Sequence, residues 1–74
     1  MNALPNIALE VFASAEVMAG NRAVSSREVL AALKLVMADD LAVQVSKKVS
    51  KLARFNKNGR TTPRDILTAL REPV

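Results

Sequence analysis

The sequence predicts an all-α protein in which a short helix, a long central helix and a second short helix follow one another in a single domain, residues 1–74. Three observations lead to this prediction. Apolar residues recur at steps of three and four, without the alternation of a β-strand. No Gly or Pro interrupts the chain between Gly20 and Gly59. Each expected helix start carries residues that suit a helix N-terminus.

The first helix is expected from Pro5 to Ala19, ending at Gly20. Proline suits a first turn, because it lacks the amide that would be left without a partner there. The spacing of the apolar residues predicts one face for the core, with Phe12 beside it; this face carries Ile7, Val11, Ala15 and Met18.

The long helix is expected to open after Val24, where Ser25 stands three residues before Glu28. This is the spacing of a capping box, in which the hydroxyl and the carboxylate each bind a free amide at the helix start. The helix would continue to Arg54, giving about 30 residues and a length of ~45 Å.

Such a helix is longer than the domain that contains it, since a compact chain of 74 residues has a diameter of roughly 30 Å. Its apolar face continues along the whole length, so a second copy of the chain is needed to cover the part that extends beyond the domain. We therefore expect an obligate homodimer. Whether dimers pair further into tetramers or larger assemblies stays open. The expected dimer core is Leu33, Met37, Leu41, Val45, Val49 and Leu52.

The last helix is expected to begin with Thr62 as its cap, Pro63 at the first position and Asp65 at the third, and to stop before Pro73. It is too short to be stable alone and must pack on the rest of the domain.

Composition excludes several classes of function. Without Cys or His, the chain has no disulfides, no ordinary structural zinc site and no thiol or imidazole chemistry. No apolar run reaches the ~18 residues of a membrane span, and no signal-peptide pattern is seen, so we expect a cytoplasmic, chromosome-associated protein without membrane contact. Nothing suggests a cofactor or a small-molecule substrate.

Positive charge is concentrated in the second half of the chain. The net charge is +4, and residues 41–74 hold eight basic and two acidic side chains, hence +6. This asymmetry indicates a polyanion or an acidic protein as partner. Lys47, Lys51 and Arg54 form a stripe at helical spacing, which is either a solvated face or a secondary surface for DNA or protein.

Three segments of the chain resemble the histone-fold family, closest in size to the tail-less single-domain histones of archaea and bacteria. They are Met37–Leu41 in the middle of the long helix, Lys51–Arg54 at its end, and Arg60–Ile66 through the second loop. The resemblance implies a histone fold that forms a head-to-tail handshake dimer. In that dimer the first loop of one subunit lies beside the second loop of the other.

The resemblance also implies a function, namely binding of double-stranded DNA with little sequence preference, by bending, wrapping or coating it in a nucleoid. The residues it places at the DNA are Arg22, Lys57, Asn58, Arg60, Thr61 and Arg64. The family pairs an arginine of the second loop with the aspartate of the last helix, so Asp65 is expected either to bind Arg60 or to lack this partner.

Alternatives remain at this point. The loop cations either hold phosphate or only keep the loops soluble, and Asp39 and Asp40 are either intersubunit salt-bridge residues or exposed charges. Adjacent helical positions point about 100° apart, so these two carboxylates are not expected to form a catalytic pair, and we expect no enzyme activity. The second function is a histone-fold dimerisation module of a larger complex with little DNA binding.

Overall fold

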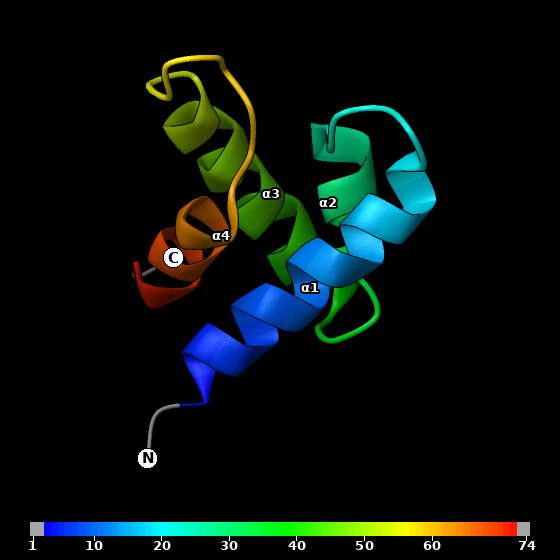
Figure 1. Ribbon diagram of the computed structural model, residues 1–74. Helices are drawn as coiled ribbons and strands as arrows, with labels where there is room; N and C mark the ends of the chain where they lie inside the picture. The colour runs from blue at the N-terminus through cyan, green and yellow to red at the C-terminus, as the bar shows by residue number, and fades with distance from the viewer. Residues whose placement is uncertain (1–2, 73–74) are drawn as a thin grey trace.

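The structure, a computed structural model, describes residues 3–72 and contains four α-helices, with no strand among these residues. The helices are α1 (Leu4–Ala19), α2 (Ser26–Leu33), α3 (Asp39–Ala53) and α4 (Pro63–Arg71) (Figure 1). The predicted all-α class is confirmed.

The first helix forms as predicted, with Pro5 in its first turn. It ends at Gly20, whose φ of 63° lies in the left-handed region that favours glycine. The buried face consists of Ala8, Val11, Ala15 and Ala19. Met18, which the spacing assigned to this face, is instead 42% exposed.

The predicted long helix is wrong, because α2 ends at Leu33 and α3 begins at Asp39. Residues 34–38, which we call the connecting turn, reverse the chain between them. The Leu35 amide donates to the Ala32 carbonyl and the Val36 amide to the Leu33 carbonyl, which tightens the end of α2 into a 3₁₀-type turn. Ala38 then has φ −62° and ψ 150°, an extended conformation that no α-helix contains.

Local and tertiary effects together explain the break. Asp39 and Asp40 occupy the first turn of α3, where negative charge is stabilised by the free amides and the helix dipole. The reversal also returns α3 against α2, so one chain buries Leu33, Val45 and Val49 in a single core. No proline or glycine signals this turn in the sequence.

Folding back removes the premise of the dimer argument. The chain measures 31 × 25 × 23 Å with a radius of gyration of 11.1 Å, so no helix extends beyond the domain. Most of the expected dimer core packs within one chain: Leu33, Val45 and Val49 are buried, and Met37 and Leu52 pack against them. Leu41 is 43% exposed and does not belong to this core.

The four helices contact one another in a ring. Helix α1 packs on α2 and α4, and α3 also packs on α2 and α4. The connecting turn therefore joins two helical pairs, α1–α2 and α3–α4, and the core lies between the pairs. This arrangement brings the loop after α1 and the loop before α4 to one end of the bundle (Figure 1).

The last helix begins as predicted. The Thr62 hydroxyl accepts from the Asp65 amide at 3.4 Å, and the Asp65 carboxylate accepts from the Thr62 amide at 3.0 Å, which completes a capping box. The helix buries Ile66 and Ala69 against α1 and α3. Its last residue is Arg71, and Pro73 lies outside the described residues.

Candidate nucleic-acid interface

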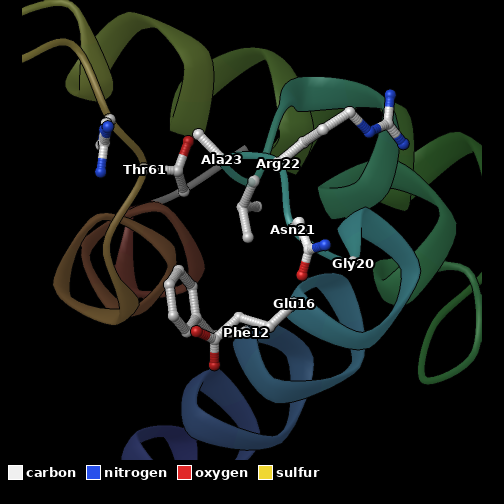
Figure 2. A pocket seen from close by; sticks show the side chains of 9 residues that line it. Phe12, Glu16, Gly20, Asn21, Arg22, Ala23 and Thr61 are labelled. Carbon is white, nitrogen blue, oxygen red and sulfur yellow. The ribbon is translucent and has the colours of Figure 1, made fainter.

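Two loops that are far apart in the sequence lie side by side. Loop 1 (residues 20–25) joins α1 to α2, and loop 2 (residues 54–62) joins α3 to α4. They share an open hollow above α1 (Figure 2), and its lining includes Arg22 from loop 1 and Arg60 and Thr61 from loop 2. Three of the predicted DNA-binding residues are thus brought together within one chain.

A second hollow opens between the same loops, toward the start of α2. Its lining carries three hydroxyl residues from the loops and the start of α2, namely Ser25, Ser26 and Thr61. Ser50 near the end of α3 and Arg54 at the start of loop 2 also line it. Thr61 lines both hollows and so lies between them. The predictions from sequence did not include Ser26 and Ser50, because serines on a polar helix face are ordinary.

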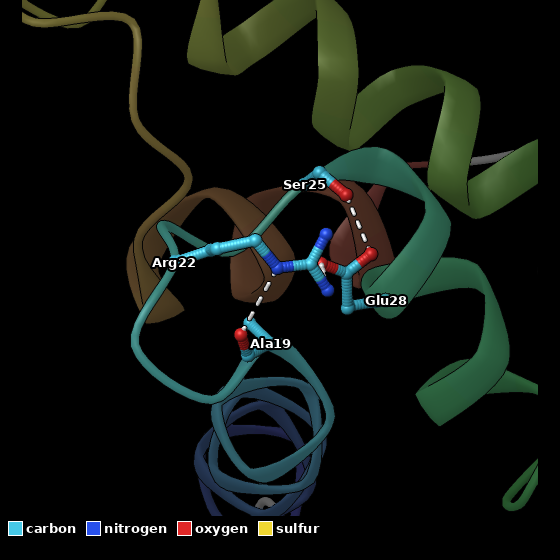
Figure 3. Close-up of polar contacts among 4 residues, drawn as sticks. All are labelled: Ala19, Arg22, Ser25 and Glu28. Carbon is cyan, nitrogen blue, oxygen red and sulfur yellow. Dashed lines mark hydrogen bonds and ion pairs between the residues drawn. The ribbon is translucent and has the colours of Figure 1, made fainter.

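Arg22 is held in loop 1 by weak contacts. Its Nε donates to the Ala19 carbonyl at 3.3 Å, and a terminal nitrogen lies 3.9 Å from a Glu28 oxygen (Figure 3). The guanidinium therefore points toward α2 and away from the first hollow (Figure 2). Since 77% of the Arg22 side chain is exposed, it is free to turn toward a ligand.

The predicted capping box at α2 is only partly present. Ser25 does occupy the N-cap position, but its side chain binds no amide. Its hydroxyl donates instead to the Glu28 carboxylate at 2.6 Å (Figure 3), and the same carboxylate lies 3.9 Å from a terminal nitrogen of Arg22. The amides of the first turn of α2 are therefore left without a side-chain cap.

Glu28 is buried and its charge is stabilised by its neighbours. The hydrogen bond from Ser25 lowers the pKa of Glu28 below its ordinary value, and the nearby guanidinium groups of Arg22 and Arg27 add to this effect. Burial acts in the opposite direction and does not overcome them.

Loop 2 is organised by an asparagine that sequence reasoning missed. The Asn56 amide nitrogen donates to the Asp65 carboxylate at 2.7 Å and to the Arg60 carbonyl at 2.6 Å. The expected arginine partner of Asp65 is therefore replaced by Asn56 in the described chain. The only signal for it was a short polar side chain at the end of the preceding helix.

The tip of loop 2 is a tight turn. Asn58 accepts the Arg60 amide at 3.1 Å, and Gly59 between them has a φ of 69°. Asn58 thus has a structural role in the loop. It and Lys57 are exposed but line neither hollow.

The remaining predicted cations are dispersed. Arg64 lies on α4 beside an apolar groove between α1 and α4, which is lined by neither loop 1 nor loop 2. Lys47 and Lys51 are exposed on α3, whereas Arg54 belongs to the second hollow. Of the stripe Lys47–Lys51–Arg54, only its last residue joins the loop pair.

One acidic side chain opposes the positive charge. Glu16 of α1 lines the first hollow with Arg22 and Arg60, so an anion there is repelled by its carboxylate. The second hollow has no acidic residue in its lining. An anionic ligand is therefore better accommodated at the second hollow, beside Arg54 and the start of α2.

Within residues 3–72, no group of three His, Cys, Asp or Glu side chains is placed to hold a metal ion, and none of the helices is long and apolar enough to cross a membrane. Comparisons of the chain with family models, with curated proteins and with solved structures find no match.

Proposed function

We propose that this protein binds double-stranded DNA through the phosphate backbone, with little sequence preference and without catalytic activity. The observation that carries the proposal is the meeting of loop 1 and loop 2, which places Arg22 and Arg60 at the first hollow and Arg54 at the second, beside the start of α2. The net charge of +6 in residues 41–74 adds a long-range attraction for a polyanion.

The chemistry of the second hollow suits a phosphate group. Arginine presents donors that match phosphate oxygens, and Arg54 is accompanied there by the hydroxyl of Thr61. The first-turn amides of α2, which lack a side-chain cap, add donors and a partial positive charge. Contacts of this kind position a protein on DNA but do not read the bases.

Duplex DNA fits better than single-stranded nucleic acid. Proteins that bind single strands without sequence preference stack successive bases on several aromatic side chains. This chain has two aromatics, and one of them, Phe12, is packed against the core. A single exposed ring does not make a stacking platform.

We further propose that two chains form the handshake dimer of the histone fold. In a dimer formed by exchange, the connecting turn would straighten, and the α3–α4 pair of each chain would pack on the α1–α2 pair of the other. Loop 1 of one chain would then lie beside loop 2 of its partner. Such exchange reuses existing contacts, so it is a low-cost route to a dimer.

Two features of the connecting turn support this exchange. Residues 34–38 contain no glycine or proline, so a straight helix over α2 and α3 meets no backbone obstacle. Leu35 and Val36 are 70% and 50% exposed in the closed chain. Together with Leu41, they would lie near the centre of the joined helix, where two paired helices would bury them.

The test is a fluorescence-anisotropy titration of random-sequence duplex at two salt concentrations. We expect binding that weakens as salt rises. The plot of log affinity against log salt should have a negative slope, and the slope should become shallower by about 0.9 for each phosphate contact removed. Arg54→Ala and Arg60→Ala should each reduce the affinity and the slope. Arg64→Ala, which removes the same charge beside a different groove, is the matched control.

Absence of binding at low salt would reject the proposal. So would equal losses for Arg54→Ala, Arg60→Ala and Arg64→Ala, since these would show a response to net charge alone and no role for the loop pair.

A different observation favours a second function, in which the protein assembles with other proteins. Leu9 and Val17 of α1 are 57% and 82% exposed, and Leu9 lines the apolar groove beside α4. Exposed apolar groups of this kind are typical of protein contacts when they form a continuous patch. Loss of a partner on Leu9→Ser, with DNA binding absent, would support this function.

A further inference from the structure

Phe55 is the most exposed large apolar side chain in the described part of the molecule, with 88% of its surface accessible. A phenylalanine in water forgoes the burial of roughly 150 Å² or more that an aromatic ring offers. Phe12, the other aromatic residue, packs against the core. The exposed position of Phe55 therefore gives it no part in the core of the folded chain.

Basic residues flank Phe55 in the sequence. Arg54 directly precedes it and lines the second hollow, and Lys57 follows two residues later. Other exposed large apolar side chains belong to α1, to the connecting turn and to the start of α3. Phe55 follows the far end of α3, about 20 Å from Leu41 at 1.5 Å per residue. It therefore does not extend the exposed apolar surface of the connecting turn.

The backbone that carries Phe55 is fixed on both sides. Its amide donates to the Leu52 carbonyl at 3.1 Å, and the Asn56 amide donates to the Ala53 carbonyl at 3.1 Å. The Asn56 side chain is tied in turn to Asp65 and Arg60. The ring is thus presented on an ordered support, which reduces the entropy lost when it binds.

We infer that Phe55 is a wedge that inserts between neighbouring base pairs of duplex DNA while the adjacent cations hold the phosphates. The inference rests on the proposed DNA binding and specifies how the duplex is deformed. Apolar wedges of this kind partly unstack a base step and kink the duplex by roughly 20–90°. The charge around Phe55 favours DNA over an apolar pocket of a protein, because Arg54 and Lys57 would lose their hydration against such a pocket.

The wedge predicts three properties of the complex. Phe55→Ala should weaken duplex binding roughly tenfold, since the contact of the ring with the opened base step is lost. The salt slope should stay unchanged, because no phosphate contact is lost. DNA bending, measured by energy transfer between dyes at the two ends of a duplex, should decrease. Leu9→Ala, which truncates another exposed apolar side chain away from the loops, should change none of these.

A tryptophan at this position supplies a direct readout, because the chain contains none. In Phe55→Trp, stacking on bases should quench the indole fluorescence when duplex is added. Wild-type affinity and bending in Phe55→Ala, with an unquenched Phe55→Trp, would overturn the wedge while leaving DNA binding intact. If the wild-type protein binds no duplex at low salt, both the proposed function and the wedge fail. Quenching of Phe55→Trp only by a protein partner would likewise overturn it.

Discussion

The hydroxyl oxygens of Ser26 and Ser50 lie 2.5 Å apart and form a hydrogen bond between the start of α2 and the end of α3. The two residues are separated by 24 positions in the sequence and belong to the two helical pairs that the connecting turn joins. In the closed chain both serines come from one molecule. In the proposed exchanged dimer, Ser26 of one chain would meet Ser50 of its partner.

A cysteine pair at these positions should therefore report which state is populated. The side chains are near enough for a disulfide to form in the double variant Ser26→Cys/Ser50→Cys, and the natural chain has no cysteine to compete. Oxidation of the closed chain should give a monomer on a non-reducing gel, and oxidation of the exchanged dimer should give a covalent dimer. A covalent dimer that rises with protein concentration before oxidation supports exchange.

Each single cysteine variant is the control, since it detects dimers formed by random collision. A double variant that yields only intramolecular disulfides at all concentrations, with and without DNA, would argue against the exchanged dimer.

A proline at position 39 should favour the closed monomer over the exchanged dimer. Asp39 is the first residue of α3, where proline is well tolerated, and Ala38 before it already has the extended conformation that a following proline requires. In a straight helix the same proline would cost about 3 kcal/mol. Asp39→Pro should therefore keep the closed fold and abolish any dimer, as measured by light scattering.

Asp39→Ala is the matched control, because it removes the same carboxylate without constraining the backbone. If both variants shift the dimer equally, then loss of the charge explains the shift, and the straightened helix is not involved.

The features that the sequence predicted well depend on local chemistry. Pro5, Gly20, Thr62 and Asp65 mark helix ends through interactions within a few residues, and the helices end where these residues predict. The capping box at Thr62 formed in full because both partners lie within one turn. The box at Ser25 is incomplete because the Ser25 hydroxyl donates to the Glu28 carboxylate and accepts no amide, and the spacing of the two residues does not distinguish these pairings.

The break after Leu33 has no local signal strong enough to predict it. Residues 34–38 are acceptable in a helix, and the turn appears because reversal lets α3 cover α2 within one chain. This is a tertiary effect that periodicity does not record. The same reversal places Arg54 beside loop 1. The sequence does not predict the reversal, so it assigns Arg54 only to a secondary surface and places Lys57 and Arg64 at the DNA.

Glu16 should weaken DNA binding in the natural protein. Its carboxylate lines the first hollow with Arg22 and Arg60, where it repels phosphate. Glu16→Gln removes this charge with little change in shape, so duplex affinity should increase by about twofold to fivefold at low salt, and the gain should shrink as salt screens the charges. Anisotropy titrations at two salt concentrations measure both effects.

Glu10→Gln on the same helix is the control, since Glu10 is exposed but does not line the hollow. An equal gain in that variant would show that the overall charge of α1 matters and the position of Glu16 does not.

The Ser25–Glu28 hydrogen bond should make stability depend on pH in the acid range. Because the pKa of Glu28 is lowered in the folded chain, its contribution is complete above the ordinary value of 4.5 and is lost as the pH falls through the folded pKa. Ser25→Ala removes the largest cause of the shift. The pKa of Glu28, followed by NMR titration, should then rise toward 4.5.

The same variant should show a smaller loss of stability below pH 4.5, as measured by urea denaturation at successive pH values. Glu28→Gln should remove this part of the pH dependence altogether. An unchanged Glu28 titration in Ser25→Ala would mean that the bond from Ser25 is not the main cause of the lowered pKa.

Asn56 should contribute more to stability than its position in an exposed loop suggests. Its amide is a hydrogen-bond donor to the buried Asp65 carboxylate, which also anchors the start of α4 through the Thr62 amide. Asn56→Ala leaves that carboxylate with one donor fewer, and we expect a loss of about 1–3 kcal/mol in the free energy of unfolding by urea. Asn58→Ala removes one bond at the exposed loop tip and should cost less than about 1 kcal/mol. Equal losses in the two variants would mean that loop 2 is held by its turn alone and that the link from Asn56 to Asp65 adds nothing to α4.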